Sequence, residues 1–227
     1  MPRPPTSRPS SVADMPAPIP VFPLQGALLL PGARLPLNIF EPRYLAMVDD
    51  ALAGHRTIGM IQPKTPERTE PDDRPPLHDL GCAGRLVSFE ETADGRYLIG
   101  LRGLCRFGVA GELDLHNGYR RIRPDYGAWA VDFERRDDAG IDREKLAGAL
   151  KSYLAARQLG ADWDTIGKTP TEELISIVAM VCPFSPIEKQ ALLESRTLTE
   201  RAELIISMLI IDSAGDSAAT PAPDRVN

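Results

Sequence analysis

The sequence lacks the patterns on which several common functions depend. Its three cysteines, Cys82, Cys105 and Cys182, are widely spaced and form no C-x-x-C pair, so they predict neither a disulfide framework nor a structural zinc site. Histidine is equally scarce, and no nucleophile elbow, H-E-x-x-H motif or dinucleotide fingerprint appears. We therefore expect no metal, no cofactor and no catalytic residue.

Long apolar runs are missing as well. The longest lie near Leu204–Ile211, far short of the ~18 residues that a membrane span needs. Residues 1–18 contain arginines but no apolar core of a secretory signal. The 26 basic and 32 acidic residues give a net charge of −6, which disfavours a general nucleic-acid binder. Together with the unpaired cysteines, these features predict a soluble, cytoplasmic protein.

Proline, in contrast, is abundant. The chain has 22 prolines, nearly twice the usual ~5% share. Many lie in residues 1–18, which we expect to be a disordered leader, and residues 213–227 resemble a matching disordered tail. The proline-rich, charged stretch 63–79 is expected to be an exposed loop. The remaining chain is long enough to bury a core.

Hydrophobic periodicity divides the rest of the chain. Residues 19–128 contain short strand-like runs and one helix, Pro42–Leu52, ended by Gly54. Asp94–Gly95 is a strong hairpin signal. We expect an antiparallel barrel or curled sheet here, with bulges or tight bends at glycines such as Gly103 and Gly111.

The period becomes helical after a connector at residues 129–140. Residues 141–212 are expected to form a helical bundle, with capping boxes at Thr169, Ser185 and Thr197 that start three of its helices. The fold class is therefore α+β.

The string Gly167-Lys168-Thr169 matches the end of a phosphate-loop motif. Asp162, however, occupies the position at which that motif needs glycine, so a structural role for these residues is favoured.

Two other patterns suggest chemistry. A Cys105 nucleophile with His116 as base is conceivable, but the strand pattern favours a buried, inert thiol. Tyr119, Arg121 and Arg123 share one face of a predicted strand and could meet RNA. Ordinary ion pairing on an acidic protein is the simpler interpretation.

The motif Ile39-Phe40-Glu41-Pro42-Arg43-Tyr44 is the most distinctive in the chain. With Ile19–Leu24 and Leu30–Gly32, it resembles the opening of the N-terminal substrate-recognition domain of ATP-dependent Lon proteases. The resemblance covers nearly all of residues 19–212, and continues through Gly81, Arg85, Asp94–Gly95, Gly103, Arg106–Phe107, Cys182–Pro186, Glu188–Gln190, Leu192–Glu194 and Arg201.

This resemblance implies a PUA-like β pseudobarrel with one helix, followed by a C-terminal α-helical bundle. It also implies a non-catalytic module that binds unfolded or tagged polypeptides, as an adaptor or regulator in protein quality control. Expected partners are such polypeptides, a protease or other protein machinery, and a weakly associating second copy. These residues contain neither a phosphate loop nor a Ser–Lys dyad, so we expect no ATPase or protease activity.

Candidate binding residues come mainly from the distinctive motif. Glu41, Arg43 and Tyr44 are expected first to hold the start of the helix, and Phe40 to lie in the core. Met47, Met60 and the 63–79 loop are expected to supply exposed apolar surface for unfolded segments. The alternative function is RNA binding through Tyr119, Arg121 and Arg123.

Overall fold

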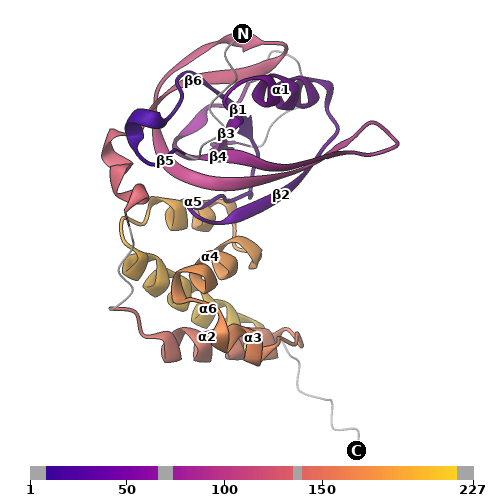
Figure 1. Ribbon diagram of the computed structural model, residues 1–227. Helices are drawn as coiled ribbons and strands as arrows, with labels where there is room; N and C mark the ends of the chain where they lie inside the picture. The colour runs from indigo at the N-terminus through magenta and orange to yellow at the C-terminus, as the bar shows by residue number, and fades with distance from the viewer. Residues whose placement is uncertain (1–8, 66–73, 135–139, 219–227) are drawn as a thin grey trace, which may run out of the picture. The chain divides into compact units, whose positions relative to one another are not determined.

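The computed structural model describes residues 9–65, 74–134 and 140–218 (Figure 1). Its contacts divide the chain into two compact units, the first formed by Met1–Arg135 with Cys182–Glu194 and the second by Arg136–Val181 with Ser195–Asn227. The ends of the expected leader and tail, the middle of the 63–79 loop and most of residues 135–140 lie outside the described ranges.

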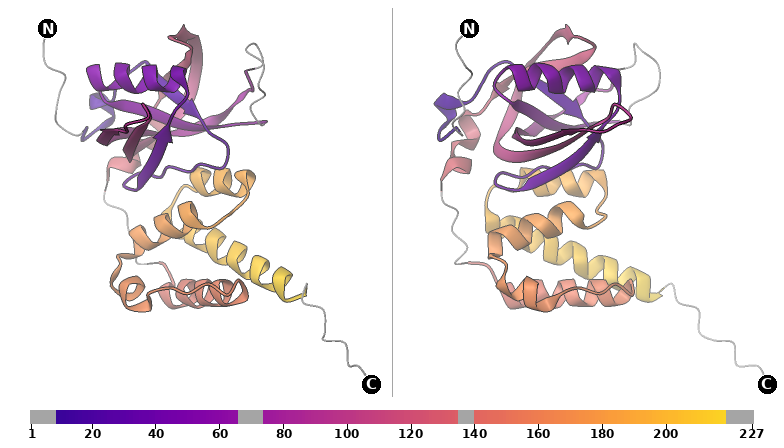
Figure 2. Two further views of the ribbon diagram at one scale, coloured as in Figure 1. Left: turned by 90° about the vertical axis from the view of Figure 1, so that its right-hand side faces the viewer. Right: turned by 45° about the vertical axis from the view of Figure 1, so that its right-hand side comes forward.

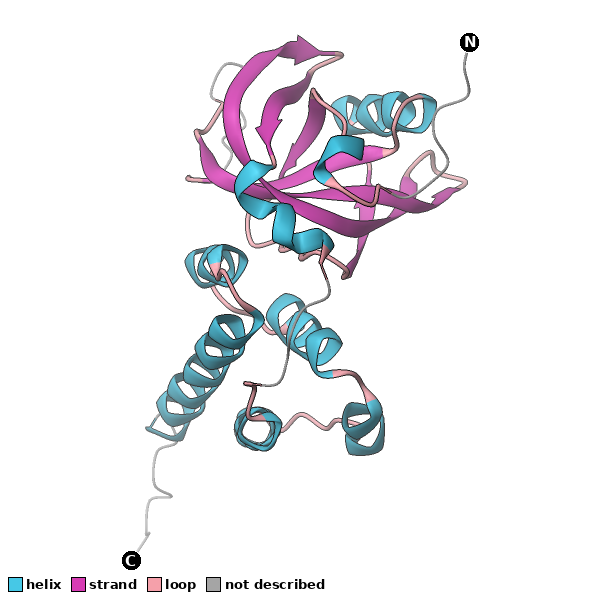
Figure 3. Ribbon diagram, turned by 60° about the vertical axis from the view of Figure 1, so that its left-hand side comes forward, coloured by secondary structure: helices cyan, strands magenta, loops and turns pink. Residues whose placement is uncertain are grey.

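The first unit is built on a six-stranded sheet with the order β2-β5-β4-β3-β1-β6, in which β6 also pairs with β5 (Figure 3). The strands are β1 (Ile19–Pro23), β2 (Arg34–Ile39), β3 (Thr57–Pro63), β4 (Leu77–Glu91), β5 (Tyr97–His116) and β6 (Tyr119–Asp125). The pairing thus runs from β5 through β4, β3, β1 and β6 back to β5.

The expectation of a purely antiparallel sheet is wrong at one position. β1 pairs with β3 in parallel, with Val21 opposite Gly59. A parallel pair needs a long crossover connection, and residues 24–56 provide it by passing through β2 and a helix. The sheet is therefore mixed. The hairpin expected at Asp94–Gly95 is confirmed, since β4 and β5 pair on either side of it.

The helix predicted at Pro42–Leu52 is confirmed as α1 (Pro42–Ala53), with proline at its first position. Its buried face, which includes Tyr44, Met47 and Val48, packs against the sheet near β1 and β6 (Figure 2). Two short 3-10 helices, η1 (Val12–Asp14) and η2 (Gly127–Phe133), also belong to this unit.

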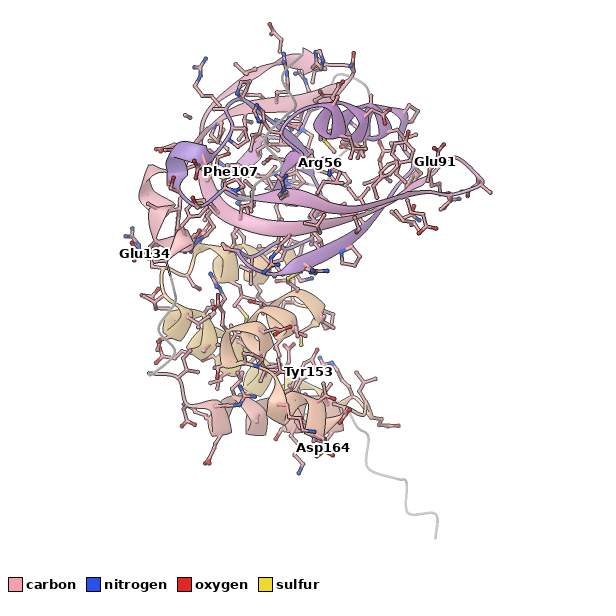
Figure 4. All side chains as sticks on the ribbon, viewed as in Figure 1. Arg56, Glu91, Phe107, Glu134, Tyr153 and Asp164 are labelled. Carbon is pink, nitrogen blue, oxygen red and sulfur yellow. The ribbon has the colours of Figure 1, made fainter. Side chains whose placement is uncertain are left out.

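Phe107 occupies the centre of the first core (labelled in Figure 4). Two glycines on neighbouring strands make room for its ring, because a Cβ at Gly81 would lie 2.5 Å from Phe107 Cζ, and one at Gly59 would lie 3.0 Å from the same atom. The predicted irregularity at Gly111 is confirmed by a register shift between Val109 and Gly111.

Helix α5 (Pro186–Glu194) belongs to the first unit, although neighbouring stretches of the chain belong to the second. Two buried glutamines, Gln62 on β3 and Gln190 on α5, connect the helix to the sheet. Gln62 Nε2 donates to Pro186 O at 2.9 Å and to Gln190 Oε1 at 3.2 Å. Gln190 Nε2 donates to Leu80 O on β4 at 3.3 Å. Lys189 Nζ adds a hydrogen bond to Gly26 O. The helix is thus held by polar contacts across more than a hundred residues of sequence.

The second unit consists of α2 (Arg143–Ala156), α3 (Trp163–Lys168), α4 (Thr171–Val181) and α6 (Leu198–Ala218). Gly167-Lys168-Thr169 lies at the end of α3, and Arg143 donates there to the carbonyls of Ile166 and Thr169 at 2.7 and 2.6 Å.

The capping boxes predicted at Ser185 and Thr197 are confirmed at the starts of α5 and α6. Each hydroxyl accepts a hydrogen bond from the backbone N–H three residues later, and the glutamate at that later position accepts one from the backbone N–H of the capping residue.

Gly148 offers a test of local helix stability. It lies in the interior of α2 with open space around the position of an added Cβ. Gly148→Ala is expected to raise the free energy of unfolding by about 0.5–1 kcal/mol, because glycine costs backbone entropy in a helix. Urea unfolding followed by circular dichroism measures the change. Gly95→Ala, also in open space but at φ 78°, should destabilise the protein.

Candidate functional site

Three neighbouring strands expose an apolar face. Asn38, Leu98 and Glu90 lie opposite one another on β2, β5 and β4, and Pro36, Gly100 and Ser88 follow two residues along. Residues of the alternate set, such as Ile99 and Leu101, are buried in the core. We call this solvent-facing side the outer face; its members are Pro36, Asn38, Phe40, Val87, Ser88, Glu90, Arg96, Leu98 and Gly100.

The outer face carries large apolar side chains in contact with solvent. Phe40 is 62% exposed, Val87 44% and Leu98 41%. Gly100 contributes no side chain between them, and an added Cβ there would lie 3.7 Å from Val87 Cγ2. The guanidinium of Arg96 lies 5.9 Å from the Phe40 ring centroid. Figure 4 locates this region through Glu91, labelled at the end of β4.

One border of the outer face is the edge strand β2. Its ladder is with β5, and it ends the strand order of the described residues. Half of the backbone N–H and C=O groups of an edge strand point away from its partner, where an extended peptide can pair with them. Pro36 removes one donor from this strand.

The expectation that Phe40 lies in the core is wrong. Ile39 takes the inward position at the end of β2, with 1% of its surface exposed, so the alternation turns the next side chain toward solvent. The predicted exposure of Met47 and Met60 is also wrong. Met47 lies on the inner side of α1 at 0% exposure, and Met60, at 3%, lies in β3, all of whose residues are buried. Neither methionine supplies accessible apolar surface.

Glu41, Arg43 and Tyr44 make contacts at the start of α1. Arg43 pairs with Glu41 at 2.8 Å and lies 4.5 Å from the Tyr44 ring centroid. The Tyr44 ring is buried and packs 4.3 Å from that of Phe22. These contacts fit the expected fold-holding role, while Glu41 and Arg43 keep part of their side chains accessible.

The basic strand does not form the face expected for RNA. Tyr119 is buried, and its hydroxyl donates to Asp50 Oδ2 at 2.8 Å. Burial and this hydrogen bond raise the pKa of Tyr119 well above its ordinary value. Arg120 forms a bidentate pair with Glu112, both contacts at 2.7 Å. Arg120 is not a member of the expected face, but the buried tyrosine ring is unavailable for stacking, and the alternative function has no support.

A cleft of about 200 Å³ lies elsewhere in the first unit. It is bordered by residues before and within β1, by the end of α1 and by the hairpin between β5 and β6. Asp50 also borders the cleft. Its Oδ2 accepts hydrogen bonds from the Tyr119 hydroxyl at 2.8 Å and from Asn117 Nδ2 at 3.0 Å, and lies 3.5 Å from His116 Nε2. Sequence reasoning missed this group, because Asp50 is more than sixty residues from the other three members and together they match no motif.

The described residues give little support to metal or thiol chemistry. Within the described ranges, no group of three or more His, Cys, Asp or Glu side chains could hold a metal ion. Cys105 is fully buried, with Sγ 3.1 Å from Arg106 O and 3.3 Å from Trp129 O, as expected of a structural thiol. None of the helices in these ranges is long and apolar enough to span a bilayer.

The fold is thus α+β, with a mixed sheet that exposes an apolar face and a separate helical unit. The family model described as the ATP-dependent protease La (Lon) substrate-binding domain matches residues 18–210, and the chain belongs to this family. The family resemblance inferred from the Ile39–Tyr44 motif and the matching segments is confirmed.

Individual relatives agree with this assignment. Lon protease 2 of Myxococcus xanthus is 26% identical over 86% of this chain, and the Lon protease of Dictyoglomus thermophilum is 32% identical over 85%. The chain spans about a quarter of the length of these relatives, 24% in both cases.

Solved structures show the same fold. The Lon N-terminal domain protein from Xanthomonas campestris matches 84% of this chain and 98% of its own, with a TM-score of 0.57 and 23% identity. The N-terminal domain of the Mycobacterium avium complex Lon protease matches 85% of this chain and 97% of its own, with a TM-score of 0.58 and 20% identity.

Proposed function

We propose that this chain is a non-catalytic polypeptide-binding module that recognises unfolded or tagged polypeptides in cytoplasmic protein quality control. The observation that carries the proposal is the exposed outer face, with Val87 and Leu98 on the paired strands β4 and β5 and Phe40 just after β2. The family's substrate-binding description supports the same role. As an adaptor or regulator, the module would deliver bound polypeptides to a protease or to other protein machinery.

The chemistry of the outer face suits unfolded segments. Such segments share little beyond apolar side chains and unpaired backbone groups, because their sequences differ. Phe40, Val87 and Leu98 offer apolar contact, and the open edge of β2 offers backbone pairing. Since no deep apolar pocket has to be matched, binding of this kind would tolerate many sequences.

Light scattering tests this function directly. A chemically denatured test protein is diluted into buffer with and without the full chain, and its aggregation is followed over time. The proposal predicts slower aggregation at equimolar amounts of the chain. Unchanged aggregation, together with no binding of the denatured protein in a pull-down, would rule the function out.

A matched pair of variants tests the role of the outer face. Phe40→Ser with Leu98→Ser is expected to weaken binding of the denatured protein at least tenfold, because exposed aromatic and aliphatic anchors carry much of the energy of such contacts. Leu115→Ser is the control, since Leu115 is also on β5, is 43% exposed and lies outside the outer face. Equal loss in both variants would contradict the assignment of this face.

A further inference from the structure

The cleft described above is bordered by an arginine, Arg121, that forms no ion pair with any carboxylate of the described residues. Arg121 Nε and Nη2 both donate to the backbone carbonyl of Asp114, at 3.4 and 3.3 Å. Within the described ranges it forms no ion pair with a carboxylate, and its Nη1 has no hydrogen-bond partner. Arg120, the preceding residue, is in contrast paired with Glu112 through both side-chain oxygens. Arg121 is therefore the cation available to a ligand.

His116 also borders the cleft and provides a second polar side chain there. Its Nε2 lies 3.5 Å from Asp50 Oδ2, so the other ring nitrogen, Nδ1, is not engaged with that carboxylate. Asp50 itself is fixed by hydrogen bonds from Tyr119 and Asn117 to the same oxygen.

One wall of the cleft is apolar. Pro16 and Pro18 border it just before β1, Pro20 borders it within β1, and Ala51 borders it from α1. Proline rings have no backbone N–H, so this wall offers hydrocarbon contact and few hydrogen-bond donors. The cleft volume of about 200 Å³ suits one small terminal group rather than a long segment of chain.

We infer that this cleft binds the C-terminal carboxylate of a polypeptide, with Arg121 as its charged contact and the proline wall against the last apolar side chain. A planar guanidinium matches the two oxygens of a carboxylate, and an apolar wall beside a cation suits a chain end better than a free inorganic anion. This inference rests on the proposed polypeptide-binding function and adds a preference for chain ends to it.

The test compares two labelled peptides with the full chain by fluorescence anisotropy. Both are decapeptides of glycine and serine that end in alanine and leucine, one with a free C-terminal carboxylate and one with a C-terminal amide. The free acid is expected to bind at least tenfold more tightly. Arg121→Gln should remove this difference, whereas Arg123→Gln, at an exposed arginine two residues along β6 that does not border the cleft, should keep it.

Further arms separate the sources of the anion. Acetate and inorganic phosphate are each added as competitors at equal concentration and ionic strength. Displacement by phosphate alone would assign the cleft to phosphate and overturn the inference.

Thermal unfolding of Arg121→Gln should match that of the parent chain, since the side chain makes only long hydrogen bonds to one carbonyl.

Equal binding of the acid and the amide, or the absence of binding by both, would also overturn the inference. The aggregation assay with the denatured test protein is independent of these peptides. Slowed aggregation together with equal peptide binding would retain the polypeptide-binding function and reject the preference for chain ends.

Discussion

Arg106→Leu is expected to destabilise the first unit by about 3–5 kcal/mol, because it leaves a buried carboxylate without its cation. Arg106 is 1% exposed and donates through Nε and Nη2 to both oxygens of Asp132, at 3.0 and 2.8 Å. The Asp132 side chain is fully buried. Arg106 Nη1 also donates to Leu193 O at 3.1 Å, and the guanidinium lies 3.8 Å from the Trp129 ring centroid. One side chain therefore holds both η2 and α5 on β5.

Urea unfolding followed by tryptophan fluorescence measures this effect. The chain has two tryptophans, Trp129 in the first unit and Trp163 in the second, so a Trp163→Phe background isolates the signal of the first unit. Arg96→Leu is the control, because Arg96 pairs with Asp94 in an exposed position and should cost at most about 1 kcal/mol. A similar small cost for Arg106→Leu would contradict the role assigned to the buried pair.

Gly103→Ala is expected to cost about 3 kcal/mol. A Cβ at Gly103 would lie 2.1 Å from Leu30 O and 2.7 Å from Leu30 C, and these backbone atoms cannot turn away as a side chain could. Gly32 N donates to Gly103 O at 3.0 Å, and Gly103 N donates to Ala33 O at 2.9 Å. Separating the two backbones would therefore combine steric strain with weakened hydrogen bonds.

The matched control for Gly103→Ala is Gly111→Ala on the same strand. An added Cβ at Gly111 meets nothing within 4 Å, so its effect should stay within about 0.5 kcal/mol. The same unfolding experiment compares both variants. If the two alanines cost the same, the close approach of Leu30 to β5 would not be what requires glycine at position 103.

Local features of the fold could be predicted from the sequence. Pro42 at the first position of α1, the Asp94–Gly95 hairpin and the boxes at Ser185 and Thr197 depend on residues within a few positions of one another. Propensity, turn geometry and capping act over this range, so a sequence pattern contains the information. The inward or outward direction of a side chain at a strand end was less secure, as Phe40 demonstrates.

Features that depend on long-range contacts could not be predicted. The parallel pairing of β1 with β3, the buried Arg106–Asp132 pair and the cleft around Asp50 each combine residues whose types are ordinary in isolation. Met47 and Met60 illustrate the same limit, because an apolar residue fits both a core and a binding surface. Strands that are distant in the sequence determine which side of a helix is buried.

The membership of α5 in the first unit has a consequence for the order in which the chain can fold. Gln62 and Arg106 find partners in residues 186–193, which are synthesised after three helices of the second unit. A nascent chain that has emerged only as far as residue 135 therefore still exposes the surface that receives α5. The contacts of the first unit can therefore be completed only after residue 194 has left the ribosome.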